Sequence, residues 1–299
     1  MRILFVTSNR LGDAVLSTGL LDHLIRAHPE ARFTVVCGPV ATGVFARMPQ
    51  LERIVALEKR QMGAHWFPLW AAVATTWWDL VVDIRGSALS WLVPTRHRAV
   101  MRRSAGHKTE QLAAILGLKP PPLPVVWTAP EDRAKAAALL PAGRPIIALA
   151  PTANWLPKIW PVDRFVAAFE ALSNGNAVAV VIAGPGPTER ATAAPLLAAL
   201  PGAIDLVGCL SLPEIAAVLE RTSLFIGNDS GLMHLAAAAG APTIGLFGPT
   251  NAAEYGPSGP KARAVISASR RMGDIAVQQI LVAALDIQTP ARDMLGRRD

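Results

Sequence analysis

The chain has 299 residues, 52% of them hydrophobic, and its 29 basic and 22 acidic side chains give a net charge of +7. Each half can therefore bury a core of its own, and the positive excess favours a polyanionic partner: nucleic acid, an anionic membrane surface or a phosphorylated substrate. Cys37 and Cys209 lie far apart, in or beside predicted strands, and no C-x-x-C is present. This pattern predicts two buried thiols rather than a metal or redox site.

No segment of the sequence is predicted to cross a membrane. The longest nearly uncharged stretch, residues 66–78, is too short to span a bilayer. The N-terminal segment lacks a small-residue cleavage site and is interpreted as a first strand rather than a signal peptide. We therefore expect a cytoplasmic or peripheral protein.

The first half of the chain is predicted to alternate strands with helices. Apolar runs predict strands at 3–7, 33–37, 53–57 and 80–84, and helical periods predict helices at 14–27, 40–47 and within 66–78. Strands that are apolar on both sides indicate a parallel sheet covered on both faces. Within 66–78, a stripe at helical spacing fits core packing or an interfacial membrane contact, and it comprises Trp66, Trp70, Val73 and Trp77.

The same alternation restarts after a proline-rich stretch at 119–124 and a Pro/Gly breaker at 141–145, which is interpreted as the interdomain linker. Strands are predicted at 146–150, 177–183, 204–207, 223–227 and 243–247, and helices at 162–172, 188–200, 212–220, 232–239 and 274–285. The predicted fold class is α/β, with two Rossmann-like domains, 1–142 and 143–299, whose parallel sheets face a cleft. Two positions stay open for the last helix: on the second domain or packed back on the first.

The most informative segment is Asn228-Asp229-Ser230-Gly231, which follows a predicted strand and leads into a helix carrying His234. The free N–H groups at such a helix N-terminus suit a phosphate. Asp229 or Ser230 as a plain N-cap is the alternative, but capping does not account for the histidine one turn later.

Three further loops follow predicted strands. The loop from Ser8 through Asn9 and Gly12 to Asp13 has one glycine, where a dinucleotide fingerprint needs three. Lys158, in a loop with two tryptophans, can neutralise a phosphate, although a surface lysine is the alternative. Glu189, after Gly184 and Gly186, could accept hydrogen bonds from ribose hydroxyls or simply begin a helix.

A basic cluster in the first half of the sequence could hold an anionic substrate. Its members are Arg96, His97, Arg98, Arg102, Arg103, His107 and Lys108. A solvated face is the alternative, and the absence of interleaved aromatic residues argues against a nucleic-acid platform.

Together these pieces resemble glycosyltransferase family 9, the ADP-heptose:lipopolysaccharide heptosyltransferases of Gram-negative bacteria. The resemblance covers nearly the whole chain, and the motifs that carry it are Leu11-Gly12-Asp13-Ala14-Val15, His28-Pro29, Lys158-Ile159-Trp160-Pro161, Asn228-Asp229-Ser230-Gly231 with His234, Leu246-Phe247-Gly248-Pro249-Thr250 and Tyr255-Gly256-Pro257. It implies the GT-B fold, with the nucleotide-sugar donor in the second domain and the acceptor in the first.

The resemblance also implies roles for individual residues. Asp13 looks like the general base and Lys158 like its catalytic partner on the donor diphosphate. The donor would contact Thr152, Lys158, Glu189, Asp229, Ser230, Gly231 and His234. The acceptor would contact Ser8, Asn9, Gly12, Arg96, Arg98, Arg102, Arg103, His107 and Lys108.

The implied reaction moves a heptosyl group from an ADP-sugar to the lipopolysaccharide inner core with inversion, with no cofactor and no metal, since the chain lacks D-x-D. Its expected partners are an ADP-heptose-like donor, an anionic glycolipid acceptor and the inner membrane leaflet, but not nucleic acid. Three alternatives stay open: another GT-B transferase or epimerase, a nicotinamide-dependent oxidoreductase, and a non-catalytic basic module.

Overall fold

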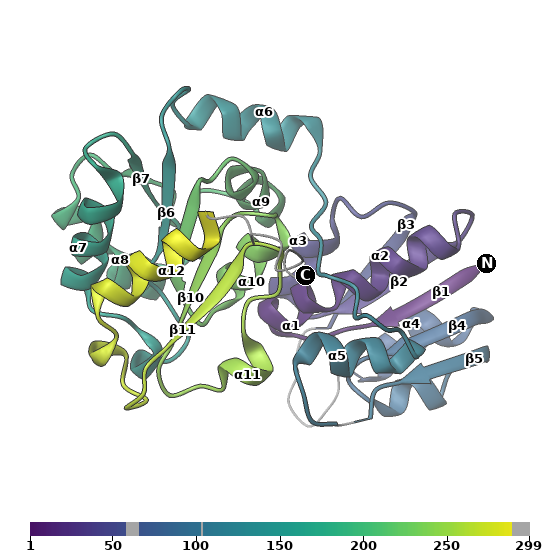
Figure 1. The fold of residues 1–299 in the computed structure, drawn as a ribbon. Coiled ribbons are helices and arrows are strands. Elements are labelled where there is room, and N and C mark those ends of the chain that lie inside the picture. The colour runs from purple at the N-terminus through teal and green to yellow at the C-terminus, as the bar shows by residue number, and fades with distance from the viewer. Residues whose placement is uncertain (58–65, 103, 289–299) are drawn as a thin grey trace, which may run out of the picture.

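The computed structural model describes residues 1–57, 66–102 and 104–288, and each half of the chain folds around one parallel sheet (Figure 1). The first sheet has the order β3-β2-β1-β4-β5. Its strands are β1 (Arg2–Val6), β2 (Arg32–Cys37), β3 (Leu51–Ala56), β4 (Trp78–Asp83) and β5 (Thr95–Val100). The second has the order β11-β10-β9-β6-β7-β8. Its strands are β6 (Ile146–Ala150), β7 (Val178–Val181), β8 (Ile204–Asp205), β9 (Leu224–Asn228), β10 (Thr243–Phe247) and β11 (Ala262–Ile266).

Both sheets reverse their strand order at the centre, as doubly wound sheets do, between β1 and β4 and between β6 and β9. Ligands bind in such folds outside the carboxyl ends of the strands at this reversal. Three of the four loops singled out in the sequence follow β1, β6 and β9, which are central strands, and the fourth, with Glu189, follows β7. The predicted α/β fold with two parallel sheets is therefore confirmed.

The helices include the predicted ones, with local differences, and three at 108–113, 130–139 and 252–255 that the sequence did not predict. In the first half they are α1 (Leu11–Leu16), α2 (Thr18–Ala27), α3 (Thr42–Phe45), α4 (Trp66–Ala74), α5 (Lys108–Ala113) and α6 (Pro130–Leu139). In the second they are α7 (Val162–Ser173), α8 (Pro187–Ala199), α9 (Leu212–Glu220), α10 (Gly231–Ala238), α11 (Ala252–Tyr255) and α12 (Val277–Gln288). None of the helices in the described ranges is both long and apolar enough to cross a membrane.

One helix predicted at 14–27 is in fact two. The Ser17 hydroxyl donates to the carbonyl of Ala14 at 2.7 Å, and the Thr18 hydroxyl donates to that of Val15 at 2.7 Å. Hydroxyls that bond back to the preceding turn bend or break a helix. The break separates short α1, which begins at the cleft, from α2, which packs along the sheet.

Two predictions about local environment need correction. Cys37 is buried as predicted, and burial raises the pKa of its thiol to about 12, whereas Cys209 is exposed because it lies in the loop after the two-residue β8. The predicted helical stripe within 66–78 does not extend to Trp77. Helix α4 ends at Ala74, Val73 is buried, and Trp77 is exposed in the turn before β4.

The hydrophobic core is continuous between the two domains. A single buried cluster includes Val15 and Phe45 of the first half together with Ile215 and Leu232 of the second. Helix α6, which precedes the predicted boundary at residue 142, packs on α9 (Figure 1). Helix α12 packs mainly on α7 and β11, not back on the first domain. The division at 142 stays a prediction, and α6 belongs spatially with the second half.

Candidate active site

The central feature of the cleft is a contact between the N-termini of α1 and α10, one from each domain. A Cβ on Gly12 would lie 2.8 Å from Cδ2 of His234, and a Cβ on Gly231 would lie 2.6 Å from the Leu11 side chain. Both distances are too short for any other residue, so glycine at these positions permits the two helices to meet. The predicted segments after β1 and β9 are thereby brought together.

The α10 N-terminus carries unpaired polar groups. Ser230 is the N-cap, but its side chain makes no capping hydrogen bond. The Ser230 hydroxyl and Nδ1 of His234 are both buried without a hydrogen-bond partner in the described part of the chain. Buried polar atoms are rarely left unsatisfied unless a ligand or water completes them. Together with the exposed N–H groups of a helix start, they favour an anionic ligand here.

Lys158 reaches this helix end from the loop after β6. Its Nζ lies 2.7 Å from Oδ2 of Asp229 and 3.5 Å from the Asp229 carbonyl. Both side chains are largely shielded, with 18% of Lys158 and 9% of Asp229 exposed. The ion pair therefore anchors the ammonium group beside the α10 N-terminus, where it can also attract an anion.

Asn228 is a positioning residue to which the sequence motif alone assigned no role. Its side-chain amide donates to the Pro151 carbonyl at 2.9 Å, and its Oδ1 accepts from the backbone N–H of Trp160 at 3.1 Å. These bonds clamp both ends of the loop that bears Lys158 and the buried Thr152. A polar residue ending an otherwise apolar buried strand was the signal that could have revealed it.

His234 is held uncharged by its surroundings. Burial is the main cause that lowers its pKa to about 4, His107 and Lys158 lower it further, and Asp229 opposes them. His107, the N-cap of α5, lies on the other side of the cleft. Its Nε2–H donates to the Gly256 carbonyl at 3.0 Å, so its Nδ1 is the atom that accepts from the Thr109 N–H. His107 therefore ties the first domain to the second.

Asp13 lies in the first turn of α1, half-buried at the cleft. Its Oδ2 accepts from the Ser8 hydroxyl at 3.2 Å, and Ser8 in turn accepts from the Arg10 N–H at 3.1 Å. Tyr255 of the second domain lies close enough that, after burial, the Asp13 carboxylate is the next cause raising the pKa of its phenol. Asp13 is thus oriented by its own loop and faces the other domain.

The neighbouring Asn9 has a structural role. Its Oδ1 accepts from Nη1 of Arg85 at 3.2 Å, and a Cβ on Gly38 would lie 2.6 Å from its Cα. The loop after β1 is therefore packed tightly against the loop after β2. This packing limits how Asn9 can turn toward a ligand.

Glu189 lies in the first turn of α8, after the carboxyl end of β7, half-buried near Gly184. The adjacent Arg190 donates to the Val207 carbonyl at 2.8 Å. A Cβ on Gly208 would lie only 3.2 Å from Cα of Pro185. The loops after β7 and β8 therefore pack together and set the position of Glu189.

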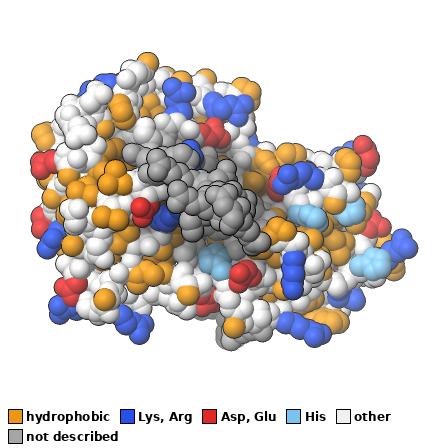
Figure 2. All heavy atoms as spheres, in the orientation of Figure 1, with side chains coloured by type: hydrophobic (Ala, Val, Ile, Leu, Met, Phe, Trp, Pro, Cys, Tyr) orange, Lys and Arg blue, Asp and Glu red, His pale blue; other side chains and the backbone are white. Residues whose placement is uncertain are grey.

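The basic cluster does not form one group in the structure. Arg96 and Arg98 are exposed on edge strand β5, and Arg98 donates to the carbonyls of Ser90 and Val93. Arg102 is exposed after that strand, and Arg103 lies outside the described residues. His107, just before α5, contacts the second domain through Gly256, whereas Nζ of Lys108 lies 4.0 Å from the sulfur of Met101 in its own domain. On the face in Figure 2, basic, acidic and hydrophobic side chains are interspersed.

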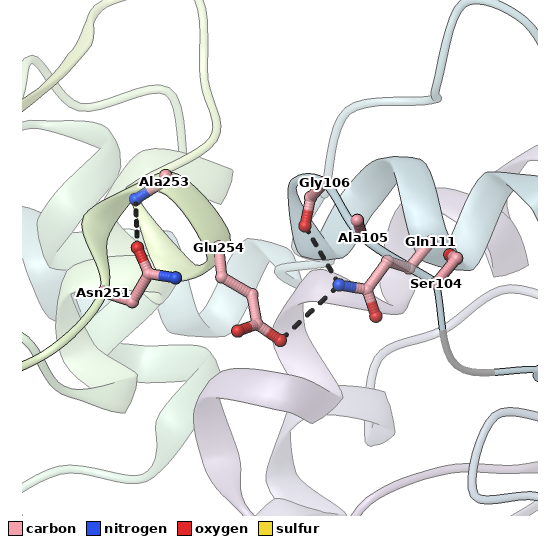
Figure 3. A pocket seen from close by; sticks show the side chains of 7 residues that line it. All are labelled: Ser104, Ala105, Gly106, Gln111, Asn251, Ala253 and Glu254. Atoms are coloured by element: carbon pink, nitrogen blue, oxygen red, sulfur yellow. Dashed lines mark hydrogen bonds between the residues drawn. The ribbon is translucent and has the colours of Figure 1, made fainter.

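A pocket of about 240 Å³ opens between the domains, between α5 and α11 (Figure 3). It is lined by Ser104, Ala105, Gly106 and Gln111 from the first domain and by Asn251, Ala253 and Glu254 from the second. The Gln111 amide donates to the Gly106 carbonyl at 3.0 Å and to Oε1 of Glu254 at 3.5 Å. The sequence reasoning missed this pocket because its residues carry no motif.

Known proteins match the chain over most of its length. The model of "Glycosyltransferase family 9 (heptosyltransferase)" matches residues 87–282. Lipopolysaccharide heptosyltransferase 1 of Pseudomonas aeruginosa is 28% identical over 289 residues, which is 84% of this chain and 79% of that protein.

Two solved structures show the same fold. The Escherichia coli ADP-heptose lps heptosyltransferase II has a TM-score of 0.77 at 21% identity, covering 96% of this chain and 98% of its own. The Escherichia coli heptosyltransferase WaaC with ADP also has a TM-score of 0.77, at 18% identity, covering 96% and 100%. The GT-B fold is thereby confirmed. Because the family model spans more than half of the sequence, this protein belongs to glycosyltransferase family 9.

Proposed function

We propose that this protein transfers a heptosyl group from an ADP-heptose-like donor to the inner core of lipopolysaccharide. Curated relatives named lipopolysaccharide heptosyltransferases and a structural relative bound to ADP support the substrates. The observation that carries the mechanism is the contact of α1 with α10, which brings the Asp13 loop against the anion-binding helix end.

The donor diphosphate would lie at the α10 N-terminus, on the N–H groups of Ser230 and Gly231. Lys158 would add a positive charge from the side, held there by Asp229 at 2.7 Å. The unpaired hydroxyl of Ser230 and Nδ1 of His234 would gain partners from the phosphates. Glu189 would accept from the ribose hydroxyls, and Thr152 would line the same crevice.

Asp13 would act as the general base. It takes the proton of the acceptor hydroxyl as that oxygen bonds to the anomeric carbon from the side opposite the diphosphate, and the bond to the diphosphate oxygen breaks. One displacement inverts the anomeric centre and releases a nucleoside diphosphate. The helix N-terminus and Lys158 stabilise the charge that develops on this leaving group. No step of this proposal is assigned to a metal.

The acceptor would enter from the first domain, over Ser8, Gly12 and Asn9. Lys108, at the start of α5, would supply positive charge to an anionic glycolipid, and His107, whose ring nitrogens bond Gly256 and Thr109, would line the same side of the cleft. Arg96 and Arg98 are not part of this acceptor site, because Arg98 already donates to two backbone carbonyls of its own domain. The nicotinamide alternative finds no support in the β1 loop, which has Gly12 as its single glycine.

The mechanism is tested by Asp13→Asn, which keeps the shape of the side chain but removes the base. Heptosyl transfer should fall on the order of 10²-fold or more, which is the usual contribution of a general base. The Kd of ADP, measured by calorimetry, should stay within about twofold because Asp13 does not contact the diphosphate.

Lys158→Ala provides the matched comparison, since it should weaken ADP binding more than adenosine binding. An Asp13→Asn enzyme that retains more than about a tenth of the wild-type rate would exclude Asp13 as the general base. Tighter binding of UDP or GDP than of ADP would overturn the heptose donor while leaving the fold unchanged.

A further inference from the structure

Helix α4 is apolar on its outer face as well as its inner one. Its sequence, Trp-Phe-Pro-Leu-Trp-Ala-Ala-Val-Ala, contains no charged residue and no polar residue other than the indole N–H groups. Leu69 and Val73 are buried against the first sheet, whereas Phe67 is 72% exposed and Trp70 is 38% exposed. Helices that are apolar all round are normally covered on every side. Here nothing in the described protein covers the outer side.

The exposed side chains of α4 continue into the 3-10 helix η3 (Ala88–Trp91). The rings of Phe67 and Trp70 have centroids 6.0 Å apart. The Trp70 indole N–H donates to the Leu92 carbonyl at 2.9 Å, and both Trp91 and Leu92 are more than 60% exposed. We call these four residues, Phe67, Trp70, Trp91 and Leu92, the aromatic face.

The aromatic face is held rigidly. The buried carboxylate of Asp83 accepts from the N–H groups of Arg85 and Ser87 at 2.8 Å each, and from the Ser87 hydroxyl at 2.7 Å. These bonds fix the turn that leads into η3. Arg53 donates to the Ala72 carbonyl at 2.7 Å and so braces the last turn of α4. The apolar surface is therefore preformed rather than the result of a loose helix.

Two arginines border the aromatic face on strand β5. The guanidinium of Arg98 lies 5.5 Å from the centre of the Trp91 ring while it donates to the carbonyls of Ser90 and Val93. Arg96 is two residues earlier on the same strand, so it points to the same side of the sheet. The aromatic face thus has a positively charged border.

We propose that the aromatic face, with Arg96 and Arg98, docks the first domain on an anionic phospholipid bilayer. Indole rings at the headgroup level and arginines near phosphates are the pattern of an interfacial membrane contact. Four apolar side chains are too few for a dimer, since stable interfaces need about 20 to 30 residues on each side. Positive charge beside the rings also favours a phospholipid over an apolar partner.

The position of this surface agrees with a lipid-borne acceptor. Helix α4 follows β3 and leads to the start of the parallel strand β4, so its first residues lie toward the carboxyl edge of the sheet, where the cleft opens. Docking through Phe67 would hold that edge near the membrane. This point alone rests on the proposed function; binding to lipid does not.

The test is flotation of the purified full chain with vesicles of phosphatidylcholine, with and without phosphatidylglycerol, in the absence of donor and acceptor. The variant Phe67→Gln/Trp91→Gln/Leu92→Gln removes three apolar anchors and should lower partition onto the mixed vesicles on the order of tenfold or more. Arg96→Glu should lower binding to the mixed vesicles but not to phosphatidylcholine alone.

The matched control is Leu123→Gln/Val282→Gln, which removes apolar side chains, each 49% exposed, from other parts of the surface. It should bind vesicles like the wild type. Unchanged ADP affinity and melting temperature of the triple variant would show that its fold is intact.

Equal vesicle binding by wild type and triple variant would overturn the proposal, as would no binding of the wild type to either vesicle. Self-association of the wild type that the triple variant loses, without vesicle binding, would assign the surface to a second copy instead. If the wild type binds vesicles but transfers no heptosyl group from any sugar donor, the proposed function would be refuted while the docking surface would stand.

Discussion

His234 shows how a single residue acquires a role from its depth. Its ring is 4% exposed, it touches Gly12 of the other domain, and its Nδ1 has no partner. Burial holds its pKa at about 4, so at neutral pH it contributes no charge to the diphosphate site. Lys158 and the α10 N-terminus therefore carry the positive charge there, and His234 contributes shape and a hydrogen-bonding nitrogen.

The depressed pKa of His234 makes stability depend on pH in a defined window. Between about pH 6.5 and 4 the unfolded chain binds a proton at this residue that the folded protein does not. The free energy of unfolding should therefore decrease as pH falls through that window, by at most about 3 kcal/mol. Urea unfolding at pH 7 and pH 5 measures this change, and the free energy of unfolding of His234→Gln should decrease less between these pH values than that of the wild type.

The exposed His97 on β5 supplies the control, since His97→Gln should leave the pH dependence of unfolding as in the wild type. Equal slopes for His234→Gln and the wild type would mean that His234 is protonated in the folded protein already at pH 5.

At the scale of elements, helices α6 and α9 pack against each other near the domain boundary. Ser211 caps α9, and the Glu214 carboxylate accepts from the Ser211 N–H at 2.7 Å and from its hydroxyl at 2.8 Å. Lys135 of α6 lies 2.7 Å from the other oxygen of Glu214. One carboxylate thus closes a helix N-terminus and fastens a second helix to it.

Glu214 should stabilise the protein above its acid range. The hydrogen bond from Lys135 is the main cause that lowers the Glu214 pKa to about 2, burial opposes it, and the two bonds from Ser211 assist. Because a depressed carboxyl pKa stabilises the folded state above the unfolded value, this contribution is lost as pH falls from about 4.5 to 2. Glu214→Gln should therefore lower the free energy of unfolding by about 1 kcal/mol at pH 7.

The measurement is urea unfolding at a series of pH values, in which the difference between wild type and Glu214→Gln should shrink toward pH 3. Glu170→Gln, at an exposed position on α7, should show no such difference. A deficit of Glu214→Gln that stays constant with pH would indicate lost packing rather than a lost ionised carboxylate.

At the scale of the whole molecule, two of the contacts between the domains differ in character. One is the contact of α1 with α10 at the donor site. The other joins α5 to the α11 region through the bond from His107 to Gly256. The bond from Gln111 to Glu254 belongs to the same contact (Figure 3). The second bridge is polar and partly exposed, so it can break and re-form, whereas the first is packed and apolar at Leu11.

Removal of the His107–Gly256 bond from the polar bridge should open the cleft without unfolding a domain. His107→Ser keeps an N-cap for α5, because serine also accepts from the first-turn N–H groups, but it cannot reach Gly256. Its radius of gyration by small-angle scattering should exceed that of the wild type without ligand, and ADP-heptose should narrow the difference. The melting temperature should change little.

Thr109→Ala, which removes a hydroxyl beside the His107 ring but not the bond to Gly256, serves as the comparison and should scatter like the wild type. Identical scattering curves for His107→Ser and the wild type would show that the His107–Gly256 bond is not needed to hold the two domains at their observed separation.

The parts that the sequence predicted are those coded by local patterns. The central strands β1, β6, β9 and β10 are continuous apolar runs, and the polar turns that follow three of them stand out against such runs. The sequence did not predict edge strands β5 and β11, because they are largely exposed and lack a continuous apolar run. The Thr95–Val100 segment was accordingly interpreted only as a basic cluster.

The sequence by itself determined the two-domain α/β fold, the loops after β1, β6 and β9, and the helix N-terminus at Ser230, since periodicity and turn chemistry act over a few residues. Only the tertiary structure decided which side chains meet: Lys158 with Asp229, Asn228 with Trp160, Gly12 with His234, and Arg98 with Trp91 rather than with the cleft. These partners are separated by up to 222 positions in the chain, as Gly12 and His234 are. Contacts of that range depend on how two sheets and their helices pack, which no local pattern encodes.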